Sequence, residues 1–454
     1  MLKKRIAGGP ELDGGRNMGI RETAMIMKQE APLMAFRSGE EKNNALRAVA
    51  EALRGQKEEI FRANKEDLER AEKEGVPVQI RKRLAMDAKK LEGVCDGIEA
   101  LISLPDPVGK VSLHRELDKG LVLRRISCPI GVIGVIFEAR PDALVQISSL
   151  CIKSGNTAIL KGGKETASTN STLYRIIHEA GTGAGLPEHF LELAQTHSEI
   201  DELLKCDREV DLLIPRGSNR FVRYIMEHTN IPVMGHSDGI CHIYVDRKAD
   251  PEIALQVITD AKTQYPVACN TVETVLADRE IADTFLPLLA GAMKRAGVRI
   301  HADDETLEIL RRGCPEETAA EFIRIEEADY HTEYGDLDLS VKVVEDTARA
   351  AEHINRYGSH HTDAIITEDD AAAAFFMRMV DSAGVYRNVS TRFADGFRYG
   401  FGAEVGISTG KLHARGPVGL EGLVTYKYEL TGNGQIVGDY ASGRSSFHFR
   451  EIDI

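Results

Sequence analysis

Apolar side chains recur every three or four positions between residues 38 and 101 of this chain. In one such stretch they are Ala45, Leu46, Val49, Ala50 and Leu53. This is the period of a helix that buries one face against a core. The spacing predicts helices at 41–53, 57–71 and 87–101.

From residue 121 onward the pattern changes to short, β-branched apolar runs that alternate with helical stretches. Strands are predicted at 121–126, 130–137, 157–161, 190–194, 210–214, 242–245, 274–277, 341–344 and 364–367. Helices are predicted at 143–153, 166–179, 218–228, 250–262, 281–296 and 347–357. This alternation is typical of βαβ units and a mostly parallel sheet. Two series of units meet near residue 250, which predicts two α/β domains with a ligand cleft between them.

The two ends of the chain do not follow this pattern. Residues 1–30 are interrupted by Gly8-Gly9-Pro10 and Gly14-Gly15, so we expect a poorly defined extension there. The stretch after residue 385 is rich in glycine and predicts long loops before a last strand at 422–428.

The composition narrows the class of protein. A chain of 454 residues is too long for one core, and 43% apolar with 28% charged residues is typical of a globular protein. The formal net charge of −14 is opposite to the basic field of a nucleic-acid binder. The sequence has no apolar run of the ~18 residues that a membrane helix needs, and its first residues lack the apolar core of a secretory signal. We therefore expect a cytoplasmic protein with no nucleic-acid or membrane partner.

One of the seven cysteines stands out by its position. The cysteines are odd in number and include no C-x-x-C pair, so neither a disulfide framework nor a metal site is predicted. Cys269 follows Pro266, which ends a predicted helix and places the cysteine on a turn before a new strand. A thiol on such a turn is better exposed to a cleft than one on a helix face. As a nucleophile it needs a thiolate pKa below the free value of about 8.5; the alternative is a small buried hydrophobe.

Two segments offer hydrogen-bond donors for a phosphate or a ribose. Arg216-Gly217-Ser218 follows a predicted strand and opens a helix, so a ligand can approach the glycine backbone and the positive helix end. The alternative is an ordinary βα turn with a serine cap. Lys161 ends another predicted strand, at the sheet edge where ligands bind. The alternative there is a solvated lysine.

Four longer segments carry a resemblance to a known family. They are PIGVIGVIFEARP at 129–141, DAKTQ at 260–264 with Cys269-Asn270 behind it, INRYGSHHTDAI at 354–365, and STRFADG at 390–396 continued by GAEVGISTGKLHARGPVGLEG at 402–422. By these segments the chain resembles the aldehyde dehydrogenase superfamily over residues 38–440. The resemblance implies an α/β fold with two Rossmann-like domains, a cleft between them and a small β flap for oligomerisation.

The resemblance also implies a division of the chain. A nucleotide-binding domain is expected from 36–120 and 142–248, and a catalytic domain from 249–419. A hairpin at 121–141 and strands at 420–454 are expected to join subunits, with residues 1–35 as a poorly defined extension. We therefore expect a homodimer or a homotetramer.

Roles for individual residues follow from the same resemblance. Cys269 is the nucleophile, and the side chain of Asn270 is a candidate for holding the oxyanion with nearby backbone amides. The cofactor is expected to be NADPH, or NADP⁺ in its oxidised form. The residues that fall where the superfamily binds its dinucleotide are Lys161, Gly217, Ser218 and Glu333.

The implied reaction is the reduction of an acyl phosphate to an aldehyde through a thioester. Hydrolytic relatives carry a glutamate where Gly235 stands here, and His236 and Asp238 are the nearest other bases. A weak water activator suits an enzyme that must protect its thioester. We also expect functional coupling to the kinase that makes the acyl phosphate.

The expected small-molecule substrate carries a phosphate, an α-carboxylate and an α-ammonium group, so its site needs cations. Arg140 and Arg415 are the guanidinium candidates, and Lys262 and His413 are weaker ones. For each of them the alternative is an unrelated surface ion pair.

Two other functions stay open. One is a different thioester-forming aldehyde dehydrogenase, either hydrolytic or acylating toward coenzyme A. The other is a relative without catalysis that serves as a structural or binding protein. Asp260 and Tyr265 depart from the residues that the family commonly carries, which leaves fine substrate recognition open.

Overall fold

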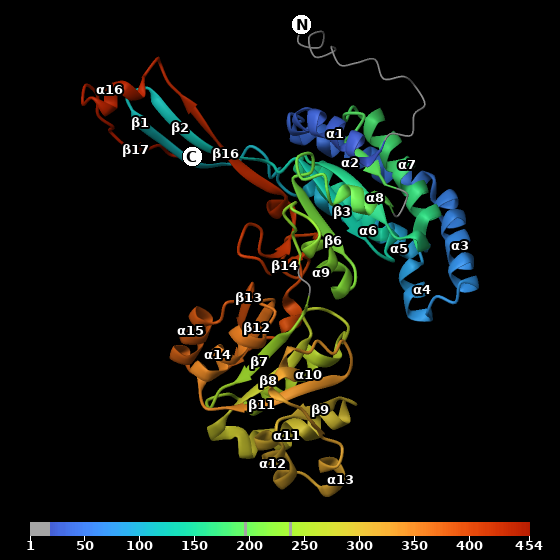
Figure 1. Ribbon diagram of the computed structural model, residues 1–454, viewed down its shortest axis with the longest axis vertical. Coiled ribbons are helices and arrows are strands. Elements are labelled where there is room, and N and C mark those ends of the chain that lie inside the picture. Colours follow the sequence, from blue (N-terminus) through green and yellow to red (C-terminus); the bar gives the residue numbers. More distant parts are fainter. Residues whose placement is uncertain (1–18, 195–197, 236–237) are drawn as a thin grey trace.

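The computed structural model describes residues 19–194, 198–235 and 238–454. Two α/β bodies and a narrow β arm that projects to one side make up the molecule (Figure 1). Each body is built on a parallel sheet, so the predicted α/β class with two parallel domains is confirmed. No helix in these ranges is long and apolar enough to cross a membrane.

The first body has a four-stranded sheet between two helical layers. Its strands, in order across the sheet, are β5 (Leu191–Leu193), β4 (Thr157–Gly162), β3 (Val132–Phe137) and β6 (Leu212–Arg216). Side chains of β3 alternate between the layers, with Ile133 and Val135 facing one and Val132 and Ile136 the other. The first layer contains α2 (Gly39–Gly55), α3 (Lys57–Lys73), α4 (Val78–Leu84), α5 (Ala88–Ser103), α6 (Pro141–Ser154) and α7 (Ala167–Gly183). The second contains α1 (Ile20–Ala35), α8 (Ser198–Leu203) and α9 (Asn219–Glu227).

Local signals explain where these helices begin and end. Ser38 and Glu41 form a capping box at the start of α2, in which each side chain accepts the other's backbone N–H. Helix α6 begins with Pro141, whose missing N–H is not needed there, and ends at Gly155 with φ +73°.

The second body repeats this arrangement around a longer sheet. Its strands, in order, are β10 (Ile323–Arg324), β9 (Arg299–Ala302), β11 (Asp338–Val344), β8 (Val272–Asp278), β7 (Cys241–Val245), β12 (Thr362–Ile366) and β13 (Gly384–Arg387). Ile243 and Val245 of β7 face one helical layer, and Tyr244 faces the other. The helices are α10 (Pro251–Thr263), α11 (Arg279–Arg295), α12 (Asp304–Gly313) and α13 (Glu316–Ala319) beside the first face, and α14 (Thr347–Tyr357) and α15 (Asp370–Met379) on the second.

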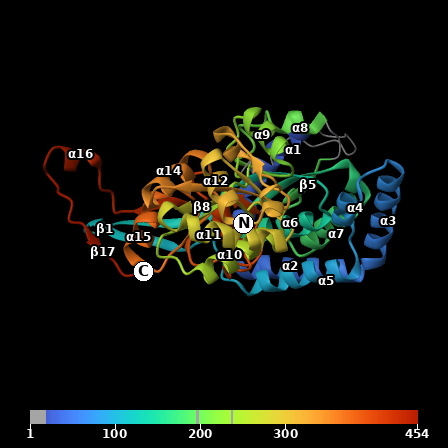
Figure 2. The same ribbon diagram turned by 90° about the horizontal axis from the view of Figure 1, so that it is seen from below.

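The arm is an antiparallel sheet that extends away from both bodies in both views (Figures 1 and 2). Its order is β16 (Val424–Thr431), β2 (Leu121–Pro129), β1 (Val111–Asp118) and β17 (Arg450–Glu451), with α16 (Val437–Ala441) near its tip. A small hairpin of β14 (Gly406–Ser408) and β15 (Gly416–Val418) lies where the arm and the two bodies meet (Figure 1).

Three boundaries differ from those expected. Residues 20–35 form helix α1 rather than a poorly defined extension, because Ile20, Ala24 and Met27 make an apolar stripe that is buried against the first sheet. Residues 1–18 lie outside the described residues. The arm begins at residue 111, and the expected hairpin at 121–141 contains β3, which belongs to the first sheet. Strand β7 belongs to the second sheet rather than to the nucleotide-binding domain, since it pairs with β8 and β12.

Candidate active site

Cys269 lies on a turn between α10 and β8, as Pro266 predicts, and its side chain is partly exposed. The turn is closed by hydrogen bonds from Thr271, whose backbone N–H donates to Ala268 O (2.9 Å) and whose hydroxyl donates to Tyr265 O (2.8 Å). Gly239 passes close beneath it, since a Cβ atom there would lie 2.3 Å from Cys269 O. The backbone of the candidate nucleophile is therefore held from two sides.

Asn270, the predicted oxyanion donor, ties a second segment to this turn. It is buried, and its Nδ2 donates to Ala394 O (2.8 Å). Its own carbonyl accepts from the Thr391 hydroxyl (2.7 Å). One amide N–H of Asn270 is thus used inside the protein, and the segment that begins with η4 (Thr391–Phe393) is fixed beside Cys269.

Two arginines that the sequence interpretation did not single out lie within electrostatic range of the Cys269 thiol. Burial lowers the pKa of Arg392, Arg398 adds to the lowering, and Cys269 opposes it. Burial also lowers the pKa of Arg216, with Arg140 adding to the effect and with Glu404 and Cys269 opposing it. Both arginines stand inside segments that carried a motif, so the signal was present, but only the fold brings them to Cys269.

The expected dinucleotide residues gather at the start of α9. The Ser218 backbone N–H donates to a carboxylate oxygen of Glu138 (3.1 Å), and a Cβ on Gly217 would lie 2.6 Å from the same atom. The Asn219 side chain donates to Glu333, which reaches α9 from the second body. Gly217, Ser218 and Glu333 therefore lie together, at a helix end where a backbone N–H already donates to an anionic oxygen.

Lys161 lies on the same edge of the first sheet. It pairs with Ile136 in the register of β3 and β4, and Ile136 pairs in turn with Pro215 of β6. Its Nζ donates to Gly162 O (2.5 Å). Burial lowers its pKa, while Glu199 and Glu165 oppose the lowering. A buried lysine that bonds only to its neighbour's carbonyl among the described residues fits a role in holding a polar ligand.

The predicted substrate-binding cations do not form one group. Arg140 is exposed at the start of α6 and is close enough to Arg216 to influence its charge. Arg415 forms an ion pair with Asp381 (3.1 Å) and, with His413, lines a separate hollow of about 380 Å³ between residues 104–110 and 400–422.

Lys262 does not reach any solvent-filled space. It is fully buried, and its Nζ donates to Glu273 Oε2 (2.7 Å) in β8. Burial raises the pKa of Glu273 to about 7, against the attraction of Lys262. The expectation that Lys262 meets substrate is therefore replaced by an internal ion pair beneath the Cys269 turn.

The segment that carries a water-activating glutamate in hydrolytic relatives begins here with Gly235. Asp238, the nearest carboxylate in the sequence, forms an ion pair with Arg223 (2.9 Å) of α9. His236, the other base considered, lies outside the described residues.

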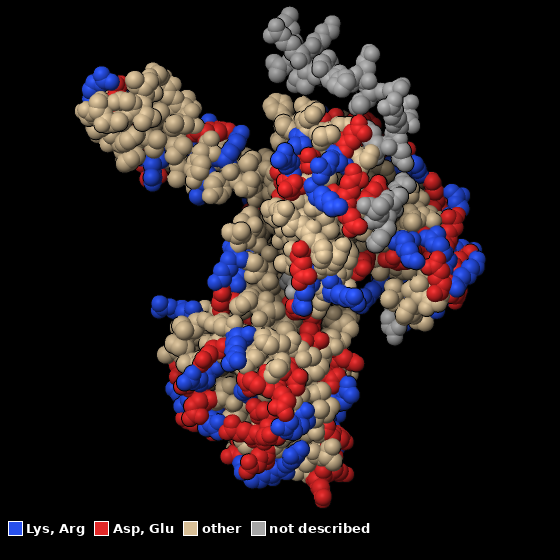
Figure 3. Space-filling view, in the orientation of Figure 1, with Lys and Arg blue, Asp and Glu red and all other residues tan. Residues whose placement is uncertain are grey.

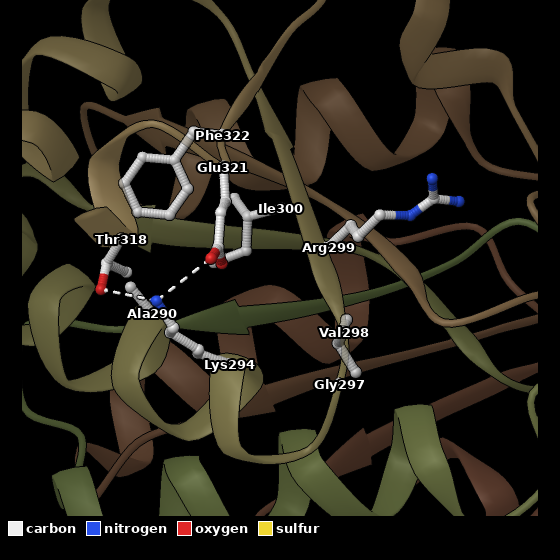
Figure 4. Close-up of a pocket in the computed structure, with 9 residues that line it drawn as sticks. All are labelled: Ala290, Lys294, Gly297, Val298, Arg299, Ile300, Thr318, Glu321 and Phe322. Carbon is white, nitrogen blue, oxygen red and sulfur yellow. Dashed lines mark hydrogen bonds and ion pairs between the residues drawn. The ribbon is translucent and has the colours of Figure 1, made fainter. Parts of the chain in front are cut away.

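A small hollow of about 160 Å³ lies at the outer end of the second body, beside β9 and α13 (Figure 4). Two cations line it: Arg299 is paired with Asp338 (2.7 Å), and the ammonium group of Lys294 donates to both Thr318 and Glu321 (3.2 Å each). Because both cations are already paired and Cys269 is not part of the lining, the hollow is not the reaction site.

Comparison with known proteins identifies the family. The sequence model of the aldehyde dehydrogenase family matches residues 16–308. Gamma-glutamyl phosphate reductase of Acetivibrio thermocellus is 51% identical over 96% of this chain and 99% of that protein. The enzyme of the same name from Pelotomaculum thermopropionicum is 53% identical over 96% of this chain and 98% of that protein. The crystal structure of gamma-glutamyl phosphate reductase from Thermotoga maritima superposes with a TM-score of 0.88 at 36% identity, covering 92% of this chain and all of that one. This chain therefore belongs to the aldehyde dehydrogenase family and, within it, to the gamma-glutamyl phosphate reductases.

Proposed function

We propose that this protein reduces L-glutamyl 5-phosphate to L-glutamate 5-semialdehyde and inorganic phosphate, the second step of proline biosynthesis from glutamate, with NADPH as the reductant. The observation that carries the proposal is a partly exposed thiol, Cys269, held on a rigid turn within electrostatic range of the Arg216 and Arg392 guanidinium groups. Relatives named for this activity share about half of their residues with the chain over nearly its whole length.

The chemistry follows from the bond that must be made and the bond that must be broken. A free carboxylate resists hydride because it is anionic and resonance-stabilised, whereas an acyl phosphate is not. The Cys269 thiolate attacks the acyl carbon, the C–O bond to phosphate breaks, and a thioester forms. When bound, the reduced nicotinamide supplies a hydride to that carbon. Collapse of the resulting hemithioacetal breaks the C–S bond, and Cys269 leaves as a thiolate.

The residues at the start of α9 suit a dinucleotide phosphate. Gly217 has no side chain to obstruct a ligand, and the Ser218 amide already pairs with the negative oxygen of Glu138. Glu333 is the candidate for a ribose hydroxyl, and Lys161 for a second ribose or phosphate oxygen. During the reaction, the second N–H of Asn270 and nearby amides are candidates for the oxyanion on the acyl carbon.

Protection of the thioester from water supports reduction over hydrolysis. Gly235 offers no carboxylate, and Asp238 is held by Arg223. A hydrolytic or coenzyme A-acylating aldehyde dehydrogenase remains the second candidate. Arg140 is the first candidate for the substrate's α-carboxylate because it lies beside Arg216, and Arg415 is the second. Lys262 drops out of the substrate site.

We further propose that the arm joins copies of this chain into a homodimer or homotetramer. Strand β16 is an edge strand, and its Tyr426, Tyr428 and Leu430 are each more than half exposed. The tip of the arm also carries few charges compared with the two bodies (Figure 3). An open edge with apolar side chains is suited to pairing with another chain. The seven cysteines, none in a disulfide among the described residues, agree with a cytoplasmic location, where glutamate 5-kinase would supply the unstable substrate.

The reaction is best tested in reverse, because an acyl phosphate is unstable. Reduction of NADP⁺ is followed with glutamate semialdehyde, with and without inorganic phosphate or coenzyme A, for the wild type and Cys269→Ala. We expect activity that needs phosphate and is lost in the variant; NAD⁺ in place of NADP⁺ tests the cofactor preference. Activity that is indifferent to phosphate would support the hydrolytic alternative, and activity that needs coenzyme A the acylating one. An inactive wild type would leave the non-catalytic alternative.

A further inference from the structure

Arg392 is buried and Arg216 is partly exposed, and neither has a carboxylate partner at hydrogen-bond distance among the described residues. Among the described residues, the Arg216 guanidinium forms no hydrogen bond or ion pair with another side chain or carbonyl. The Arg392 side chain is 9% exposed, and its one acceptor in these ranges is the neutral Gln264 Oε1, at 2.9 Å from Nε. Buried charges are as a rule paired, because an uncompensated one costs several kcal/mol, about 3–5 in mutational tests. Arg392 is such a charge, and together with the partly exposed Arg216 near the same thiol it indicates that a negative ligand completes the site.

The fold holds both guanidinium groups in place. Arg392 is fixed to the two ends of the Cys269 turn, through Gln264 on one side and through the neighbouring bond from Thr391 to Asn270 on the other. Its Cζ also lies 5.9 Å from the Tyr265 ring centre. Arg216 ends β6 and packs on Gly406, where a Cβ atom would lie 2.9 Å from Nη1. The glycine therefore leaves room for the guanidinium to face the junction of the two bodies.

We propose that Arg216 and Arg392 form the subsite for the phosphoryl group of the acyl phosphate, which rests on the function proposed above. The phosphoryl oxygen is bonded directly to the carbon that Cys269 attacks, so it must lie next to the sulfur. The α-carboxylate is separated from that carbon by three further carbon atoms. The cations that interact with the thiol therefore meet the phosphoryl group, and Arg140 or Arg415 is left for the carboxylate.

The subsite has a defined part in the chemistry. In the forward direction the bond from the acyl carbon to the phosphate oxygen breaks, and phosphate takes the electron pair. Two guanidinium forks neutralise this charge as it develops. In reverse, a phosphate oxygen attacks the thioester carbon, the C–S bond breaks, and Cys269 leaves as a thiolate.

Kinetics in the reverse direction separate this role from others. We expect Arg216→Gln and Arg392→Gln each to raise the KM for inorganic phosphate at least tenfold, with the KM values for semialdehyde and NADP⁺ changed less than threefold. Arg→Lys at either position should recover part of the loss, since the charge remains without the fork. Arg279→Gln, at a surface arginine paired with Glu305 and Glu345, serves as the control. An unchanged KM for phosphate, or a rise in the semialdehyde KM instead, would overturn the proposal.

A second measurement does not depend on turnover. Alkylation of Cys269 is timed with anionic iodoacetate and neutral iodoacetamide, after subtraction of the Cys269→Ala background. We expect the iodoacetate-to-iodoacetamide rate ratio to fall severalfold in both glutamine variants. The protection that inorganic phosphate gives to Cys269 in the wild type should fall with it. A ratio equal to that of the wild type, in variants that melt like the wild type, contradicts the subsite. If the wild type reduces NADP⁺ without phosphate, the proposed function fails, and the alkylation ratio still decides whether the arginines bind an anion.

Discussion

The turn that carries Cys269 has cations on two sides, and they differ in whether a carboxylate of the protein pairs with them. On the inner side, Lys262 is fully buried and bonds to Glu273 at 2.7 Å. On the side where the two bodies meet, Arg216 and Arg392 have no carboxylate partner among the described residues. A cation with an internal counter-ion is already neutralised within the fold. A cation without one is available to neutralise a negative ligand. The comparison separates a structural pair from a binding site, whereas the sequence interpretation named Lys262 as a substrate-binding cation and did not name Arg216 or Arg392 as one.

The inner pair joins the elements that position the nucleophile. Lys262 belongs to the end of α10 and Glu273 to the start of β8, so their bond closes the base of the Cys269 turn. The second oxygen of Glu273 accepts from the Gly335 backbone N–H (3.3 Å), two residues beyond Glu333. The pair thereby links the Cys269 turn to the loop that reaches α9.

The largest expected effect comes from removing one half of this pair. Lys262→Met leaves the Glu273 carboxylate buried without its counter-ion, which should lower the free energy of unfolding by about 3–5 kcal/mol. Arg216 is partly exposed and has no internal counter-ion, so Arg216→Met should change the free energy of unfolding by less than about 1 kcal/mol. Urea titration followed by circular dichroism, with the cofactor absent, measures both.

A matched control sharpens this difference. Lys248→Met removes the same side chain from an exposed pair with Asp369 and should cost far less than Lys262→Met, because solvent screens an exposed pair. Equal losses for Lys262→Met and Lys248→Met would show that the inner pair is not the brace inferred here.

The next effect is a pH dependence of the Lys262→Met variant. Burial already raises the pKa of Glu273 to about 7, and loss of Lys262 removes the main opposing attraction, so the pKa rises further. A carboxyl with a raised pKa in the fold adds stability while it is protonated and loses it as pH rises through that pKa. Above pH 7 the variant should therefore lose stability relative to the wild type, by up to about 1.4 kcal/mol per pH unit. Urea titrations at pH 6, 7, 8 and 9 test this, and the added change Glu273→Gln should abolish the slope.

The parts of this site that could be predicted from sequence are those with a local signal. Pro266 is enough to place Cys269 on a turn, and uninterrupted runs such as 130–137 are enough to predict buried strands. The apolar stripe of α1 was obscured by the glycines before it, although Ile20, Ala24 and Met27 carry the helical period.

Pairings between elements have no such local signal. Glu273 stands 11 residues from Lys262, and their contact exists only because α10 packs beside β8. Arg216 and Arg392 come from different bodies of the protein, so their common approach to Cys269 depends on how the two sheets meet. Sequence periodicity defines each sheet but not the junction between them.

On the open side of the turn, a ligand should supply the missing stability. Inorganic phosphate at ten times its dissociation constant should stabilise the wild type by about 1.4 kcal/mol, a rise in melting temperature of about 1–3 °C. Arg216→Gln and Arg392→Gln should lose this response, while Lys248→Met keeps it. Differential scanning fluorimetry against sodium chloride of equal ionic strength removes the general salt effect. A full response in both arginine variants would mean that phosphate binds elsewhere.

The smallest expected effect concerns how Arg392 is held. The Tyr265 ring lies 5.9 Å from its Cζ and is 44% exposed, so the cation–π contact contributes about 0.5–1 kcal/mol. Tyr265→Ala should then raise the KM for phosphate about two- to fivefold, and Tyr265→Phe, which keeps the ring, should leave it unchanged. The reverse assay at varied phosphate measures both variants. Equal increases in the two would assign the effect to the hydroxyl group and remove the ring from the subsite. No increase in either would mean that Gln264 and the segment at 391–394 hold the guanidinium without help, because Arg392 keeps its bond to Gln264 in both variants.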